Sequence, residues 1–315
     1  MIISASRRTD IPNYYSEWFL NRIREGFVCV RNPMNVHQIS RIPLSPDVVD
    51  CIVFWTKNPA NMLDKLDLLK DYQYYFQYTI TPYGKDIERN IPDKNGVVIP
   101  VFKTLSEKIG SERVIWRYDP IFFSEKYTPE YHLRAFRKIA GELKGYTQKC
   151  VISFVDIYRK NKKRLEEANA APPVGDELWD FCKELKEIAD SCGMELATCT
   201  EKIDLTPLGI THNSCIDRNL IEKLLGCKII SKKDKNQREE CGCVESIDVG
   251  AYNTCMNLCT YCYANFSVDN VLKNQLEHNV NSPLLCGDIG PGDTIHDRSV
   301  SSVKAGPEQL NLWEI

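Results

Sequence analysis

Residues 49–56 read "VDCIVFWT", and residues 58–72 that follow read "NPANMLDKLDLLKDY". The first run is rich in β-branched and aromatic residues, which favours a strand. The second run carries apolar residues at helical spacing, namely Met62, Leu63, Leu66 and Leu69. Successive parallel strands need crossover connections, usually helices. The stretch therefore predicts one β-then-α unit of a parallel sheet.

The same unit recurs through the first two hundred residues. Strand-like runs occupy 1–6, 49–56, 74–81, 113–120, 150–157 and 193–200. Amphipathic helical patterns occupy 16–26, 58–72, 128–144 and 175–193. Thr128 before Pro129 is typical of a helix start, and Gly26 and Gly193 are typical of helix ends. Six β-then-α units in a row predict an α/β protein with a parallel sheet.

Polar and charged residues recur just beyond the predicted strands, as at Arg7, Arg8 and Asp10, Lys57 and Asn58, Thr79, Arg117 and Asp119, Asp156, and Glu201. In a (β/α) barrel these strand ends converge on one mouth, so we expect a full or partial barrel of about six units. The alternative is that loops simply begin with polar residues. No G-x-G-x-x-G follows the first strand and no P-loop is present, so dinucleotide and nucleotide-triphosphate sites have little support.

The pattern changes near residue 200. We expect a barrel-like domain over 1–200, a cysteine-rich region over 201–265 packed on the barrel mouth, and a C-terminal helix and tail over 266–315. The charge run at 231–240, "SKKDKNQREE", predicts a solvated loop. The run at 268–279, "VDNVLKNQLEHN", predicts the helix, and a tail rich in Gly, Pro, Asp and Ser follows.

The overall composition is that of an ordinary globular protein. The 315 residues are 43% hydrophobic and 26% charged, with a formal net charge of −3, which argues against broad non-specific binding to nucleic acid. No apolar run approaches the roughly 20 residues that span a bilayer, so no membrane partner is expected. The N-terminus lacks the layout of a secretory signal. We expect a cytoplasmic protein.

Fourteen cysteines in a reducing compartment do not indicate a disulfide framework. Three of them, Cys255, Cys259 and Cys262, form a C-x3-C-x2-C motif. A structural zinc site normally has four ligands, so a nearby Cys241 or Cys243 would have to complete one here. The other interpretation is a 4Fe–4S cluster in which three thiolates hold three irons and the fourth iron stays open for another ligand.

The stretch "CMNLCTYC", residues 255–262, resembles the signature of the radical S-adenosylmethionine (SAM) enzymes, including the aromatic Tyr261 before the last cysteine. With the following "YAN", it is similar to the cluster loop of spore photoproduct lyases. The resemblance implies that the amino and carboxylate groups of SAM bind the open iron of the cluster, that SAM is cleaved to methionine and a 5′-deoxyadenosyl radical, and that Tyr261 lies against the adenine. It also implies a reductant such as flavodoxin or ferredoxin. The substrate is unknown, and a DNA-repair lyase of the photoproduct type is one alternative.

The position of the motif departs from that family, in which it usually follows the first strand. Here the first strand leads into "SRRTDIP", residues 6–12, and the motif comes after the sixth strand. The whole chain is similar to an uncharacterised domain-of-unknown-function family that shares "SRRTDIP" and "CGCVESIDVGAYNTCMNLCTYCYAN", residues 241–265. This resembles a permuted radical SAM architecture. The usual SAM contacts cannot be transferred, and no "GGE"-type run follows the second strand.

A second group of thiols comprises Cys199, Cys215, Cys241 and Cys243. Four cysteines complete the coordination of zinc or of an auxiliary 4Fe–4S cluster. An auxiliary cluster is common in the family that the motif resembles, so we favour it, while zinc and unliganded thiols stay open.

Two further features bear on ligands. Arg7 and Arg8 could clamp a carboxylate or phosphate of SAM or substrate, or instead pair with Asp10 or Asp119. Arg117 and Asp119 could also face the cavity at the barrel mouth. The C-terminal "EQLNLWEI", with Gln309, Leu310, Leu312 and Trp313, resembles the peptide by which bacterial DNA-repair and replication proteins bind the sliding clamp. The alternative is that this tail packs on the barrel.

These observations favour a radical SAM enzyme with its cluster on the C-x3-C-x2-C motif. The rival hypothesis from another class is a binding protein stabilised by structural zinc, without radical chemistry.

Overall fold

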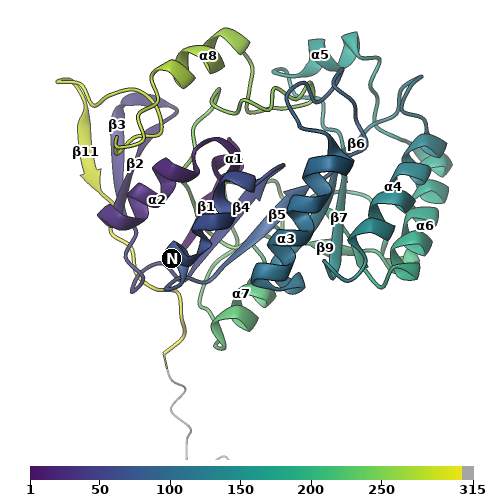
Figure 1. The fold of residues 1–315 in the computed structure, drawn as a ribbon, viewed down its shortest axis with the longest axis horizontal. Helices are drawn as coiled ribbons and strands as arrows, with labels where there is room; N and C mark the ends of the chain where they lie inside the picture. The colour runs from purple at the N-terminus through teal and green to yellow at the C-terminus, as the bar shows by residue number, and fades with distance from the viewer. Residues whose placement is uncertain (307–315) are drawn as a thin grey trace, which may run out of the picture.

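A computed structural model describes residues 1–306 of the chain, which form an α/β fold around one eight-stranded parallel sheet (Figure 1). The strand order is β10-β1-β4-β5-β6-β7-β8-β9. The strands are β1 (Ile2–Ala5), β4 (Cys51–Thr56), β5 (Tyr74–Thr79), β6 (Val114–Ile121), β7 (Lys149–Phe154), β8 (Glu195–Cys199), β9 (Thr211–Asn213) and β10 (Ile247–Asp248). The six predicted strands are confirmed as β1 and β4 to β8, and all neighbours pair in parallel.

The sheet is open. Barrel closure requires hydrogen bonds between the first and last strands of the sheet, and here β10 and β9 form two separate edges. Both edge strands come from the region after residue 200 and are short, with two and three residues respectively. The parallel β/α arrangement is therefore confirmed and a closed barrel is not.

Helices and turns connect the strands. The α-helices are α1 (Ile11–Tyr14), α2 (Ser16–Glu25), α3 (Ile99–Ile109), α4 (Pro129–Leu143), α5 (Lys162–Glu167), α6 (Gly175–Ser191), α7 (Arg218–Leu225) and α8 (Val268–Leu276). The 3-10 helices are η1 (Ala60–Leu69), η3 (Ser111–Arg113) and η4 (Thr206–Leu208), and η2 (Lys94–Val98) is a short π-helix. The helices predicted over 16–26, 128–144, 175–193 and 268–279 are confirmed.

The helix over 58–72 differs in type from the α-helical pattern that was predicted there. It forms η1, a 3-10 helix, and not an α-helix. Leu63, Leu66 and Leu69 recur every third residue, which suits a helix with three residues per turn. The expected helix signals hold elsewhere: the Thr128 hydroxyl accepts a hydrogen bond from the backbone N–H of Tyr131, and Gly26 ends α2 in the left-handed conformation with φ 77°.

The two faces of the sheet are covered differently. On one face, alternate strand residues such as Phe54, Phe76 and Trp116 pack against α2, α3, α4 and α6, which lie along that side in Figure 1. On the other face, Val53, Tyr75 and their neighbours pack against α7 and the cysteine-rich segment. The region after residue 200 therefore covers the face that would line the interior of a closed barrel.

A second, smaller sheet was not predicted from the sequence. It has the order β11-β3-β2 and comprises β2 (Phe27–Asn32), β3 (Asn35–Pro43) and β11 (Thr294–Asp297). β2 and β3 form an antiparallel hairpin, to which β11 from the C-terminal tail adds in parallel. The described part of the tail, which is rich in Gly, Pro, Asp and Ser, thus carries a strand, and that strand is exposed along its length. The clamp-like residues Gln309, Leu310, Leu312 and Trp313 lie outside the described residues. No helix within residues 1–306 has both the length and the apolar character needed to cross a membrane.

Candidate functional site

The cysteine loop, residues 253–265, lies over the carboxyl ends of β1 and β4. The side-chain amide of Asn257 donates to the Asp10 carboxylate at 3.0 Å, and the hydroxyl of Tyr14 donates to the amide oxygen of Asn257 at 2.9 Å. The same Asp10 carboxylate accepts from the backbone N–H of Lys57 at 2.8 Å. Asp10 therefore joins the loop after β1, the loop after β4 and the cysteine loop.

A cavity of about 140 Å³ opens between the cysteine loop and these strand ends. Its lining includes the residues predicted to bind the cluster and SAM and three of the predicted catalytic residues, namely Cys255, Cys259, Cys262, Tyr261, Arg7, Arg8 and Asp10. Lys57 and Trp55 also contribute to the lining. Residues far apart in sequence thus meet at one place, because the carboxyl ends of parallel strands share one edge of the sheet.

Two thiols of this loop, Cys255 and Cys259, are held in their protonated form by their surroundings. Burial raises the pKa of Cys255 well above its usual value, and Asp10 and the two neighbouring thiols raise it further. Burial raises the pKa of Cys259 to about 12, although Lys57 opposes the shift. Metal ligation requires thiolates, so a bound cation would have to supply the charge that stabilises them.

Arg164 of α5 holds the backbone of the loop from the other side. Its guanidinium donates to the carbonyl oxygens of Cys259 at 3.3 Å, Cys262 at 2.6 Å and Asn265 at 2.8 Å. The side-chain amide of Asn161 donates to the carbonyl of Tyr261 at 3.0 Å. Both residues were missed in the sequence, because nothing in the motif indicates which distant segment supports it.

A buried ion network lies beside the cavity and was also missed. The carboxylate of Glu88 is 1% exposed and accepts from Lys57 Nζ at 2.7 Å, Lys94 Nζ at 2.6 Å and the Thr81 hydroxyl at 2.6 Å. The hydroxyl of Tyr261 donates to the same carboxylate. Burial alone would raise the pKa of Glu88, but the two lysines bring it down to about 2. Glu88 is therefore ionised at neutral pH and anchors Tyr261.

The two N-terminal arginines have different partners. The guanidinium of Arg7 lies 5.1 Å from the Trp55 ring centroid, and its Nη2 is buried without a hydrogen-bond partner. Arg8 lies over Tyr252 and has its Nε 4.0 Å from the carboxylate of Asp248. Among the described residues, neither arginine forms the alternative ion pair with Asp10 or Asp119. Arg7 thus has an unpaired donor beside the cavity.

Asp248 itself was not singled out in the sequence, yet it fixes the turn after β1. Its carboxylate accepts hydrogen bonds from the hydroxyls of Ser4 at 2.8 Å and Ser6 at 2.6 Å, and from the backbone N–H of Arg7 at 2.9 Å.

Arg117 and Asp119 are not among the residues that line this cavity. Arg117 Nε donates to the carboxylate of Asp119 at 2.9 Å, and its Nη1 donates to Cys215 Sγ at 2.9 Å. Burial would raise the pKa of Asp119, but Arg117 lowers it below its usual value. This pair therefore belongs to the surroundings of the second cysteine group and not to the lining of the cavity.

The second cysteine group is brought together by the fold. The sulfurs of Cys199 and Cys215 lie 3.2 Å apart, and Cys241 and Cys243 belong to the same apolar cluster as Cys215. In the part of the chain that the structure describes, no group of three or more His, Cys, Asp or Glu side chains is arranged around a common point as a metal site. The four thiols are therefore neighbours in one cluster, with two of the sulfurs in contact.

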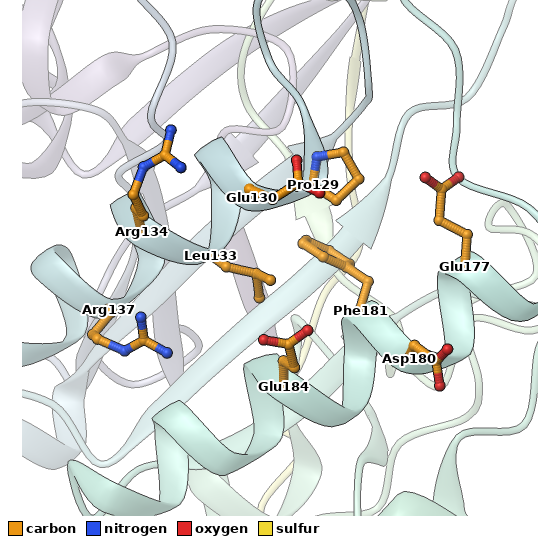
Figure 2. A pocket seen from close by; sticks show the side chains of 9 residues that line it. All are labelled: Pro129, Glu130, Leu133, Arg134, Arg137, Glu177, Asp180, Phe181 and Glu184. Carbon is orange, nitrogen blue, oxygen red and sulfur yellow. The ribbon is translucent and has the colours of Figure 1, made fainter.

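A larger cavity, of about 410 Å³, lies elsewhere, in the groove between α4 and α6 (Figure 2). Arg134 and Arg137 extend from one helix, and Glu177, Asp180 and Glu184 from the other, with Leu133 and Phe181 between them. None of the site residues predicted from the sequence lines this groove. We therefore place the candidate site at the smaller cavity beside the cysteine loop.

Comparison with known proteins gives a family but no activity. Residues 2–264 match the family described as "Domain of unknown function (DUF1848)". No curated protein matches the chain.

Proposed function

Because the chain belongs to this family of unknown function, its activity has to be argued from its site, and we propose that it is a radical SAM enzyme. One observation carries the proposal. The three cysteines of the C-x3-C-x2-C motif line one cavity at the carboxyl edge of a parallel sheet, together with Arg7, Arg8 and Lys57. In this view the open sheet serves as a partial barrel with the cysteine loop over its mouth.

The donor set fits a 4Fe–4S cluster with one iron left open. Cys255, Cys259 and Cys262 are the only cysteines in the cavity lining formed by the described residues, and no histidine joins them there. No hydrogen bond joins any two of their sulfurs in residues 1–306, as expected for thiolates that sit on separate irons. When bound, the cluster and SAM would supply a 5′-deoxyadenosyl radical that abstracts hydrogen from the substrate, with an electron from a protein such as flavodoxin or ferredoxin.

The chain's own residues would bind and orient the ligand. Two buried donors at the cavity, Arg7 Nη2 and the Thr9 hydroxyl, have no hydrogen-bond partner among residues 1–306. A guanidinium suits a carboxylate, which SAM carries. Lys57 is already paired with Glu88, so it contributes positive charge and not a free donor. Arg7 is therefore the residue that we assign to the carboxylate.

The size of the cavity limits what it holds. Its volume of about 140 Å³ is below the range of about 300–1,000 Å³ for drug-sized ligands. Because the three cysteines line this cavity, the cluster would occupy it, and most of SAM would extend beyond it. Tyr261 lines the cavity with its hydroxyl held by Glu88, so its ring orientation is fixed where the adenine contact is proposed.

Anaerobic reconstitution tests the proposal. The wild-type chain is expected to take up iron and sulfide and to form 5′-deoxyadenosine from SAM and a reductant. The variant Cys255→Ala/Cys259→Ala/Cys262→Ala should lose both properties, whereas Cys192→Ala, at the end of α6, should keep them. A colourless wild-type protein that holds zinc at the motif under strict anaerobiosis would instead support the zinc-stabilised binding protein.

A further inference from the structure

We propose that Cys199, Cys215, Cys241 and Cys243 bind a single tetrahedral Zn²⁺ ion that is separate from the cavity of the cysteine loop. The proposal rests on the convergence of these four thiols and the spacing of their sulfurs. It does not depend on radical SAM chemistry.

The four thiols come from separate segments of the chain. Cys199 ends β8, Cys215 follows β9, and the pair Cys241 and Cys243 follows the charged loop of residues 231–240. Cys215, Cys241 and Cys243 are buried, and Cys199 packs against the same apolar cluster on the inner face of the sheet. Four thiols from three segments do not meet in one cluster by local sequence alone, so the fold itself assembles the group.

The sulfur spacing distinguishes one ion from an iron–sulfur cubane. Zinc–sulfur bonds of about 2.3 Å place the sulfurs of a tetrahedral site about 3.8 Å apart. The sulfurs of Cys199 and Cys215 lie 3.2 Å apart. In a 4Fe–4S cluster each thiolate binds a different iron, which holds the sulfurs much farther apart. The close approach of these two sulfurs therefore favours one small ion.

The surroundings supply donors to the sulfurs. Arg117 Nη1 donates to Cys215 Sγ at 2.9 Å, and the backbone N–H of Ile216 donates to Cys243 Sγ at 3.3 Å. Four thiolates around Zn²⁺ carry a net charge of −2. Arg117 and the nearby Arg7 partly offset that charge, and outer-shell hydrogen bonds of this kind orient metal ligands.

The backbone at Gly242, between Cys241 and Cys243, is packed against the segment that carries Cys215. A Cβ atom added at Gly242 would lie 2.5 Å from the hydroxyl oxygen of Ser214, the residue before Cys215. A side chain at residue 242 would therefore displace the Ser214 hydroxyl, at the place where the two ligand-bearing segments touch. Cys199 and Cys215 are already in contact and Cys241 and Cys243 lie in the same cluster, so zinc binding requires the four side chains to turn toward a common centre. The ion would fix the segment that covers the inner face of the sheet.

Metal analysis of the full chain, purified anaerobically without added iron, tests this site. We expect one zinc per chain in the wild type and in Cys192→Ser, and loss of that zinc in Cys241→Ser/Cys243→Ser. After reconstitution, the double variant should keep the iron that the Cys255→Ala/Cys259→Ala/Cys262→Ala variant loses, while the triple variant keeps its zinc. If the zinc contents are as expected but the reconstituted wild type takes up no iron, the proposed function is refuted and the zinc site is not.

Two outcomes would overturn the zinc site. Loss of about four irons in the double variant would assign a cubane to the group, and unchanged metal content would leave it as free thiols. If the double variant does not fold, the wild type is exchanged with Co²⁺. Tetrahedral thiolate coordination then gives intense sulfur-to-cobalt charge-transfer and visible d–d bands, and their absence refutes the site.

Discussion

The hydroxyl of Tyr261 donates a hydrogen bond to the carboxylate of Glu88, which also accepts from the buried ammonium groups of Lys57 and Lys94. The aromatic residue of the cysteine motif is thereby attached to an ion network that is almost wholly removed from water. Lys57 also lies with its Nζ 5.6 Å from the Tyr261 ring centroid. The position of the cysteine loop over the sheet thus depends on the ion pairs of Glu88 with Lys57 and Lys94, which are not part of the motif.

Glu88→Gln is expected to lower the free energy of unfolding by about 3–5 kcal/mol, because it leaves two buried ammonium groups without a counter-charge. Urea denaturation at pH 7.5 measures the change. The matched control is Glu166→Gln on α5, whose carboxylate is exposed and, among residues 1–306, pairs only with Lys162, so it should cost less than about 0.5 kcal/mol. Equal losses in the two variants would show that the network does not stabilise the fold.

Arg164→Gln is expected to loosen the cysteine loop, because three carbonyl oxygens lose a charged donor. Hydrogen bonds to charged groups contribute about 1.5–3 kcal/mol each. The reconstituted variant should therefore lose iron to a chelator at least about tenfold faster than the wild type. Lys163→Gln, whose side chain is 89% exposed, is the control and should behave as the wild type. Equal rates of iron loss in all three proteins would show that Arg164 does not help to retain the cluster.

Arg7→Gln is expected to weaken SAM binding by about 10- to 100-fold, the effect of losing one charged hydrogen bond. Calorimetry on anaerobically reconstituted protein measures the dissociation constant, and iron content confirms that the cluster site is intact. Arg24→Gln, on the exposed side of α2, is the matched control. Unchanged affinity in Arg7→Gln would exclude Arg7 as the carboxylate ligand.

The sequence predicted the frame of the fold because local patterns determine it. Each of the six central strands is a short apolar run, and α2 and α4 carry the capping residues expected of them. The small sheet was not predicted, because β11 pairs with β3 across more than 250 residues and neither strand has a local signal for that partner. Closure of the barrel also depends on pairing between distant edges, which no local pattern contains.

The candidate site likewise contains residues that could be predicted from the sequence and residues that could not. Cys255, Cys259, Cys262 and Tyr261 could be found from spacing, and Arg7, Arg8 and Asp10 from their place after the first strand. Glu88 and Arg164 could not, because they lie in segments with no motif and act only through tertiary contacts. Arg117 and Asp119 were predicted at the same mouth, but Arg117 contacts Cys215 on the inner face of the sheet and Asp119 pairs with Arg117.

His132 gives a prediction of pH dependence. Burial lowers the pKa of His132 to about 4, and the neutral ring bonds with the Tyr118 hydroxyl and the Phe122 carbonyl. The unfolded chain, with a histidine pKa of about 6.5, therefore binds the proton first as pH falls. The stabilisation by neutral His132 should be complete above pH 6.5 and should be lost as pH falls from about 6.5 to about 4.

Urea denaturation of wild type and His132→Phe at several pH values measures this. The variant should be about 1–3 kcal/mol less stable at pH 7.5, and the difference should shrink at pH 4.5. Burial raises the pKa of Glu201 to about 7, so Glu201 adds stability as pH falls, opposite to the effect of His132. This contribution is the same in wild type and variant and cancels in the difference between their free energies of unfolding. His296→Phe, at an exposed position, is the control. A difference that stays constant with pH would exclude His132 as the titrating group.

The place of β1 between β4 and β10 has a consequence for biosynthesis. Ser4 pairs in register with Asp248, so the first strand to leave the ribosome keeps one unsatisfied edge until about three-quarters of the chain has been translated. Contacts of such long range slow folding, and an unpaired strand edge is a template for aggregation. A nascent or truncated chain that ends before Ile247 should therefore need chaperone protection that the full-length protein does not.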